Sequence, residues 1–285
     1  MMERADRWLR PAVPEERLRL VRALVSAFAL VYVLVRFRYF ANLTALDPRA
    51  FAPVGIARVL SSPLSPVVTW LIAIATAALG VAFATGRRVA WTGPLFAFAF
   101  LWITTYRSSW GKILHTENLV ALHLVVLAIG ARGPFAARRA GWTLQTMNLV
   151  TVATYFVAGV TKLRAGGTAW VSGRALGDWL AYDALRKIEL GSYSSPIAGW
   201  LSAHSSLLAV LAIFTLVIEL GAPLALVSRR TRVAWALGAF GFHAGILATM
   251  AIAFFYPLTL VAFAPLFEIE RIPPLARIAG YLTRR

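Results

Sequence analysis

Long apolar runs recur along this chain of 285 residues, and they constrain its fold more than any other feature. A helix that crosses a bilayer needs about 20 mostly apolar residues. The runs of this kind are 20–40, 66–85, 89–106, 114–131, 142–163, 203–228, 233–250 and 252–267. Hydrophobic residues make up 59% of the chain, which is more apolar side chain than a soluble core of this size can bury. The sequence therefore predicts an all-α, polytopic transmembrane helical bundle with about eight spans.

The arginines and lysines are distributed unevenly between the segments that join these runs. If the amino terminus is cytoplasmic, 18 of the 29 lie on the inner side. Cytoplasmic loops of membrane proteins carry an excess of these residues. We therefore expect both termini in the cytoplasm and an even number of spans, in an integral protein of a bacterial inner membrane. The basic lead from Arg4 to Arg22 is too long for a cleaved signal, so the first span is expected in the mature protein.

The sequence also predicts structure in the segments outside the apolar runs. Residues 164–202 mix tryptophan, tyrosine and leucine with charges, which indicates an outer interfacial amphipathic helix near 173–189. Residues 41–65 carry turn signals and are typical of an ordered loop. Residues 268–285 alternate apolar side chains with arginines and are expected to form an inner interfacial tail. We find no second domain, so 1–285 is predicted to be a single transmembrane domain.

Charge and composition exclude several classes of function. The net charge is +17, but the arginines form short groups between apolar runs and no basic stripe, so we expect no nucleic acid partner. The chain has no cysteine, which excludes disulfides and thiolate chemistry, and any redox chemistry must come from a bound partner molecule. No pair of histidines has the i, i+4 spacing of a helical metal site, and we expect no metal.

Lys162 is the strongest candidate for chemistry. It ends the apolar stretch from Tyr155 to Leu163, and it is one of only three lysines in a chain that otherwise uses arginine. A lysine held against a membrane segment can lose its proton, which arginine in practice cannot do. Lys162 is therefore a candidate base. The alternative is an interfacial lysine whose stem covers apolar surface while its ammonium group reaches water.

Other ionisable residues lie at membrane depth, where each is a functional hypothesis because burying it is costly. By the predicted topology, His115 opens its span on the same outer side on which Lys162 ends its own, so the two can share a cavity that faces the outer side. His243 can approach this cavity from below, and Asn118 lies on the same helical face as His115. The alternatives are an interfacial His115 and a His243 that only packs between helices.

Two further buried residues have plainer interpretations. His123 is expected to be a packed helix contact. Glu219 is expected to be a structural carboxyl group, protonated or paired with arginine, between helices.

Three stretches, in order, carry a resemblance to a known family. Tyr155–Leu163, followed by Trp170 and Gly173, resembles the lysine segment of the vitamin K-dependent gamma-carboxylases and their bacterial HTTM-domain relatives. Ser108-Ser109-Trp110 leading to His115 is similar to the family's Ser-Trp…His segment. Phe242-His243, followed by 254–257 and 264–267, is similar to its late Phe-His segment. The resemblance covers about residues 17–270.

The resemblance implies a chemistry and a site. In this family the lysine deprotonates a reduced naphthoquinone, oxygen adds, and the strong base that results removes a proton from a glutamate, which takes up CO2. Carried over, Lys162 is the base, and His115 and His243 shape the pocket. The reduced quinone would be vitamin K hydroquinone or menaquinol, entering from the lipid bilayer, with O2 and CO2 as co-substrates. The predicted pocket residues are Trp110, Asn118, Tyr155, Trp170 and Glu219.

The chain departs from the family pattern at points that affect this expectation. Thr161 stands where the carboxylases have a lysine, and 166–170 replaces an Asp-Trp pair. The carboxylases continue into a large extramembrane domain that helps to bind the peptide substrate, and this chain ends at Arg285. These departures favour quinol oxygenation over protein carboxylation.

Two alternatives belong to other classes. The first is a non-catalytic binding or assembly module that works with a peptide or a separate partner protein, in which Lys162→Arg is tolerated. The second is a transporter, for which discontinuous helices and paired halves are expected. The sequence shows neither feature.

Overall fold

The computed structural model describes residues 2–111, 113, 115–132 and 138–283, and every regular element within these ranges is helical. Four helices there are long and apolar enough to cross a membrane: α2 (Glu15–Val35), α4 (Pro66–Ala84), α5 (Val89–Ser108) and α12 (Arg229–Met250). A fifth crossing is counted if α10 (Pro196–Ser202) and α11 (Ser205–Leu220), which are bent by 109°, form one span. The all-helical fold is thus confirmed, with four helices among the described residues that could cross a membrane, and the count of eight spans stays a prediction.

Each of the first seven predicted spans contains a helix, and two of these helices are α6 (Asn118–Arg132) and α7 (Arg139–Gly166). The prediction of a helix over 252–267 was wrong, because no continuous helix forms there, and whether this segment crosses the membrane stays a prediction. The segment contains only α13 (Phe255–Leu258) and the 3₁₀ turn η5 (Val261–Leu266). Ala251 and Leu260 adopt left-handed conformations that interrupt a helix. Pro265, which lacks a backbone N–H, lies inside η5.

Serine caps begin several of these helices. Ser65 and Ser195 each precede a proline at the first helical position, and each side chain accepts a hydrogen bond from a backbone N–H of its helix. Ser228 and Thr231 form a reciprocal capping box at the start of α12. The sequence thus fixes where α4, α10 and α12 begin.

The chain divides into two compact units, and each is described by itself. Unit 1 comprises 1–147 and 264–285, and unit 2 comprises 148–263, with α7 passing from one into the other. The single-domain prediction stays a prediction. The remaining elements of unit 1 are α1 (Met2–Leu9), α3 (Phe37–Asn42), η1 (Leu43–Ala45), η2 (Pro48–Ala50), η3 (Gly55–Val59), η6 (Ile269–Arg271) and α14 (Pro273–Thr283). Those of unit 2 are α8 (Thr168–Val171), α9 (Arg174–Glu189) and η4 (Ala222–Leu226).

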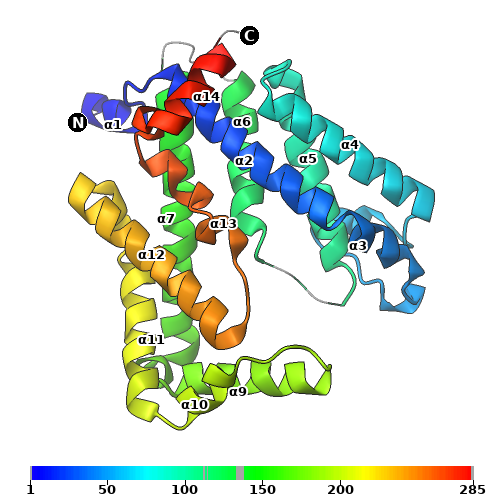
Figure 1. The fold of residues 1–285 in the computed structure, drawn as a ribbon, viewed down its shortest axis with the longest axis vertical. Coiled ribbons are helices and arrows are strands. Elements are labelled where there is room, and N and C mark those ends of the chain that lie inside the picture. The colour runs from blue at the N-terminus through cyan, green and yellow to red at the C-terminus, as the bar shows by residue number, and fades with distance from the viewer. Residues whose placement is uncertain (1, 112, 114, 133–137, 284–285) are drawn as a thin grey trace. The chain divides into compact units, whose positions relative to one another are not determined.

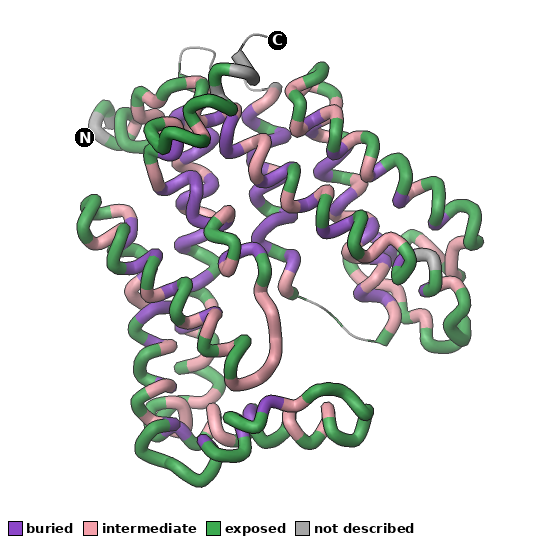
Figure 2. Tube along the Cα trace, viewed as in Figure 1, coloured by how far each residue is buried: buried purple, intermediate pink, exposed green. Residues whose placement is uncertain are grey.

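Unit 1 is built around α2, which runs across α4 and α6, while α5 contacts both of those helices (Figure 1). Its core contains a row of aromatic rings. Phe83 packs on Phe96, Phe96 on Phe100, Phe100 on Tyr32 and Tyr32 on Phe40, with ring centroids 5.6 to 6.4 Å apart. Tilted and edge-on contacts of this kind stabilise a core beyond their buried area. The buried stretches of α2, α5 and α6 in Figure 2 follow this interior.

Ion pairs in unit 1 tie distant segments to the start of α2. An Arg17 nitrogen lies 2.6 Å from a Glu270 oxygen, and Arg139 at the start of α7 lies 3.5 Å from Glu15. The start of α7 and the carboxyl-terminal segment therefore lie at the same end of unit 1 as the start of α2. Lys112, Leu114 and the last two residues of the predicted tail lie outside the described residues.

Unit 2 contains a helix at the position predicted for the amphipathic helix. α9 covers 174–189, and Trp179, Tyr182, Leu185 and Ile188 are exposed on it. Its opposite side packs through Leu180 onto α10 and α11. The helix is confirmed, and its place at the outer membrane surface stays a prediction.

The same region holds the end of α12. The Lys187 ammonium group donates to the carbonyl oxygen of Met250, and the Ser195 hydroxyl donates to that of Ala248 at 2.6 Å. These bonds satisfy carbonyls that the end of a helix leaves without intrahelical partners.

Candidate functional site

The candidate site begins where α7 and α11 approach closely within unit 2. Gly159 allows this approach, because a Cβ atom there would lie 2.9 Å from the Cβ of Glu219 and 3.0 Å from the Leu220 side chain. Lys162 follows Gly159 by one helical turn. Its ammonium group forms an ion pair with Glu219, whose side chain is only 4% exposed, compared with 23% for Lys162. A buried charge pair therefore links the two helices.

Two aromatic rings lie close to the Lys162 ammonium group. The Trp170 ring centroid lies 5.2 Å from it and that of Phe242 lies 5.4 Å from it, within the range of cation–π attraction. Gly166 leaves room for the Trp170 ring, because a Cβ atom at position 166 would clash with the indole at 2.1 Å. Gly173 has a left-handed conformation, and a Cβ there would meet the backbone of Ala209 at 2.3 Å. Both glycines thus position the segment that carries Trp170.

A second polar pair lies on the same two helices that hold Lys162 and Phe242. The Tyr155 hydroxyl and Nε2 of His243 are 2.7 Å apart, and both residues are buried. Tyr155 precedes Lys162 by two turns of α7, so both lie on one face of that helix. Phe242 joins the pairs, because its ring lies 4.9 Å from that of His243 and also contacts the Lys162 ammonium group.

Two buried polar atoms of this cluster have no hydrogen-bond partner among the described residues. They are Oε2 of Glu219 and Nδ1 of His243. Buried polar atoms of proteins are nearly always hydrogen-bonded, so each such atom needs an explanation. An oxygen that accepts and a ring nitrogen that can donate or accept are suited to the hydroxyl groups of a ligand.

Sequence reasoning found five of these residues but not how they interact. Lys162, Tyr155, Trp170, Glu219 and His243 all lie in unit 2 and belong to this cluster. Glu219 was expected to be protonated or paired with arginine, and its partner is a lysine. The expected arginine partner was therefore wrong, and a purely structural role for Glu219 stays a prediction.

The other predicted site residues lie in unit 1. α6 begins at Asn118, so His115 is an exposed loop residue and does not open a helix. This corrects the expectation that His115 and Asn118 share a helical face. Trp110 lies just after α5 and packs on Phe51 with ring centroids 5.1 Å apart. A cavity shared by His115 and Lys162 stays a prediction.

Sequence reasoning missed several aromatic neighbours of the cluster. Trp235 meets Tyr155 edge-on at 5.1 Å, Phe254 lies 5.0 Å from His243, and Phe263 lies 5.6 Å from Trp235. Phe254 was part of a quoted motif. Trp235 carried no signal beyond its place one turn after the arginines that begin α12.

A buried polar network in unit 1 was also missed. Arg107 donates to Glu117 at 2.9 Å and to the Tyr32 hydroxyl, next to the start of α6. In the sequence, Arg107 is only one of the 11 lysines and arginines outside the predicted inner segments. The ring of His123 contacts the carbonyl oxygen of Met147 and is fully buried, as its interpretation as a packed helix contact requires.

Comparison with known proteins adds no assignment to this geometry. Within the described residues no group of three His, Asp or Glu side chains could hold a metal ion together. No family model, curated protein or solved structure matches the chain. The gamma-carboxylase resemblance therefore rests on the quoted motifs alone.

Proposed function

We propose that the protein is a membrane-embedded, gamma-carboxylase-like enzyme that oxygenates a reduced quinone, with Lys162 as the base. The observation that carries this proposal is the Lys162–Glu219 pair, set between aromatic rings on helices that also hold Tyr155 and His243. A lysine at this place combines a proton-transfer partner with surfaces on which a flat ring can stack.

The pair supplies a route to a neutral amine. Outside water both charges of an ion pair lose their hydration, so the neutral form of the pair becomes accessible. In the proposed step Glu219 accepts one proton from Lys162, and the free amine then takes the proton of a quinol hydroxyl. Glu219 keeps the first proton, so the products are an ammonium group, a carboxylic acid and the quinol anion. General bases of this kind act from within hydrogen-bond reach of the proton.

The residues present fit a reduced naphthoquinone. Trp170, Phe242 and Phe254 offer rings for stacking, and Oε2 of Glu219 and Nδ1 of His243 are polar atoms without described partners. The reduced quinone and O2 would give the quinone epoxide and water. In the family that the chain resembles, the free energy released by this oxygenation drives carboxylation of a glutamate by CO2. Here the substrate of that second step would be a peptide or a partner protein.

For the topology we propose an even number of crossings, about eight, with both termini in the cytoplasm of a bacterial cell and the site toward the outer face. The excess of arginine in the predicted inner segments supports this. The ion pair of Arg17 with Glu270 also supports it, because it holds the carboxyl-terminal segment to the start of α2. The irregular segment 251–268 would then return the chain to the inner side.

The test is an oxygenation assay on purified protein with reduced naphthoquinone and O2, read out as quinone epoxide by mass spectrometry. Wild type is expected to form epoxide, and Lys162→Ala and Lys162→Arg are both expected to lose it, since arginine stays protonated. Arg174→Ala, an exposed change on α9, is the matched control and should keep activity. Absence of epoxide from the folded wild-type protein refutes the proposal.

A second candidate is favoured by the same ion pair. Lys162 and Glu219 neutralise each other's charge in an ion pair between α7 and α11. A purely structural link between helices of an assembly module would have the same arrangement. In that case Lys162→Arg is as stable as the wild-type protein. Neither the wild-type protein nor any of the variants forms epoxide.

The bend between α10 and α11 bears on the transporter alternative. No discontinuous helix was expected from the sequence, whereas the described residues include this bent pair. Broken helices often line substrate sites in transporters. Substrate uptake into proteoliposomes that Glu219→Gln abolishes would favour this function over oxygenation.

A further inference from the structure

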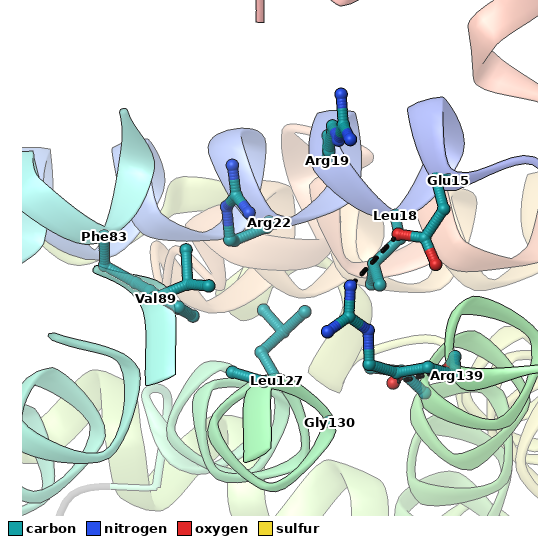
Figure 3. Close-up of a pocket in the computed structure, with 11 residues that line it drawn as sticks. Glu15, Leu18, Arg19, Arg22, Phe83, Val89, Leu127, Gly130 and Arg139 are labelled. Atoms are coloured by element: carbon teal, nitrogen blue, oxygen red, sulfur yellow. Dashed lines mark hydrogen bonds and ion pairs between the residues drawn. The ribbon is translucent and has the colours of Figure 1, made fainter. Parts of the chain in front are cut away.

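A pocket in unit 1, distinct from the cluster around Lys162, lies where several helix ends meet. α2 and α5 begin near it, α4 and α6 end near it, and α7 begins beside it (Figure 3). Its empty volume, including the open mouth, is about 400 Å³.

The polar side of the pocket carries an excess of positive charge. Arg19, Arg22 and Arg139 line it, and Glu15 is the only acidic residue among the lining side chains. Arg139 points toward Glu15, but the nearest nitrogen and oxygen are 3.5 Å apart, which is a long contact (Figure 3). Three arginines and one acidic residue thus line this pocket.

Two of these guanidinium groups have unused donors. The Nε atoms of Arg22 and Arg139 are buried, and neither has a hydrogen-bond partner among the described residues. An arginine Nε–H and a neighbouring Nη–H form the fork that binds two oxygens of one anion. These unused donors at one pocket indicate a ligand with several acceptor oxygens.

The other side of the pocket is apolar. Leu18, Phe83, Val89 and Leu127 line it, and Figure 3 shows Leu127 on α6 facing α2. Gly130 keeps α6 close to α7, because a Cβ there would lie 2.2 Å from the Thr143 hydroxyl oxygen. The pocket therefore joins an anion-binding rim to an apolar wall between helices that are apolar enough to lie in a bilayer.

We propose that this pocket binds a phosphate group through Arg22 and Arg139, with Arg19 adding charge at its mouth. Basic pockets between transmembrane helices are suited to anionic lipid headgroups. The phosphodiester of an anionic phospholipid and inorganic phosphate present the same oxygens, and the apolar wall is complementary to the acyl chains of the first. The proposal does not depend on the chemistry assigned to Lys162.

The test compares ligand binding by the full chain in neutral detergent. Native mass spectrometry measures retention of added phosphatidylglycerol, with phosphatidylcholine as the uncharged comparison. Thermal unfolding measures stabilisation by inorganic phosphate. Arg22→Gln removes one fork without touching the contact of Arg139 with Glu15. Arg87→Gln is the matched control, because Arg87 is an exposed arginine of the same unit, in the turn between α4 and α5, and does not line the pocket.

We expect wild type and Arg87→Gln to retain phosphatidylglycerol over phosphatidylcholine, and Arg22→Gln to bind it about tenfold more weakly, as the loss of one charge-assisted contact predicts. Stabilisation by inorganic phosphate that Arg22→Gln abolishes, without lipid preference, assigns the pocket to free phosphate. If neither ligand binds, or if Arg87→Gln weakens binding as much as Arg22→Gln, the proposal is overturned. Should Arg22→Gln fail to fold, Arg19→Gln is measured in its place, with about a threefold loss expected from its charge alone.

Discussion

The ion pair of Lys162 with Glu219 predicts an unequal response to the loss of either partner. Lys162→Met leaves a carboxylate whose side chain is 4% exposed, and removing one partner of a buried pair costs about 3 kcal/mol or more. Glu219→Gln leaves an ammonium group on a side chain that is 23% exposed and can extend toward water, so we expect about 1 kcal/mol. The larger loss should follow removal of the lysine.

The double variant Lys162→Met/Glu219→Leu separates the pair from its surroundings. It removes both charges and keeps similar volumes, so it should regain most of the stability, to within about 1 kcal/mol of wild type. The corresponding coupling energy between the two sites is about 3 kcal/mol, the upper part of the usual range for residues in contact.

The assay is reversible unfolding in mixed detergent micelles, followed by circular dichroism, for wild type, both single variants and the double variant. Arg49→Gln is the control, since Arg49 pairs with Asp47 at an exposed site and its loss should change stability little. Equal losses for the two single variants, or a double variant as unstable as their sum, would refute the reasoning from burial.

Two further predictions concern pH and helix packing. Burial raises the pKa of Glu270, but hydrogen bonds from Arg17 outweigh this, so the pKa is held below its usual value of 4.5. The stabilisation is therefore complete above pH 4.5 and lost as the pH falls through the native pKa, so acid unfolding curves of wild type and Glu270→Gln should converge there. Gly159→Ala should lower the unfolding free energy by about 1–3 kcal/mol, because the new Cβ meets Glu219 at 2.9 Å. Gly241→Ala, with nothing within 4 Å, should leave it unchanged or higher, and equal losses at both glycines would contradict the packing argument.

Helix positions followed from the sequence wherever local chemistry decides them. The helix predicted near 173–189 covers 174–189, and the apolar run at 66–85 forms a helix over 66–84 behind its serine cap. The helix predicted over 252–267 does not form, because hydropathy reports burial and not backbone geometry. Leu260, which has a left-handed conformation, and Pro265, which lacks a backbone N–H, both interrupt a helix there. Mean hydropathy is insensitive to both features.

Pairings between distant residues could not be predicted in the same way. Lys162 and Glu219 are 57 positions apart, and Tyr155 and His243 are 88 apart. Lys162, Glu219 and His243 were each identified alone, because an ionisable group at membrane depth is unusual, and Tyr155 was identified through the family resemblance. The partner of each residue depends on which helix faces meet, and that is set by close approaches such as the one at Gly159, which no periodicity in the sequence reports.

The choice of lysine over arginine was the first reason to suspect chemistry at position 162, and the structure gives that choice a second meaning. Lys187 has no proposed chemistry, yet its ammonium group pairs with Asp183 at 2.7 Å and donates to the carbonyl oxygen of Met250. A compact ammonium group fits such an enclosed place between acceptors, whereas a planar guanidinium group requires a wider, flatter arrangement. Residue type alone therefore does not identify a base. What distinguishes Lys162 is its aromatic contacts and the unpartnered polar atoms nearby, so Lys162→Arg must abolish epoxide formation while the variant remains folded.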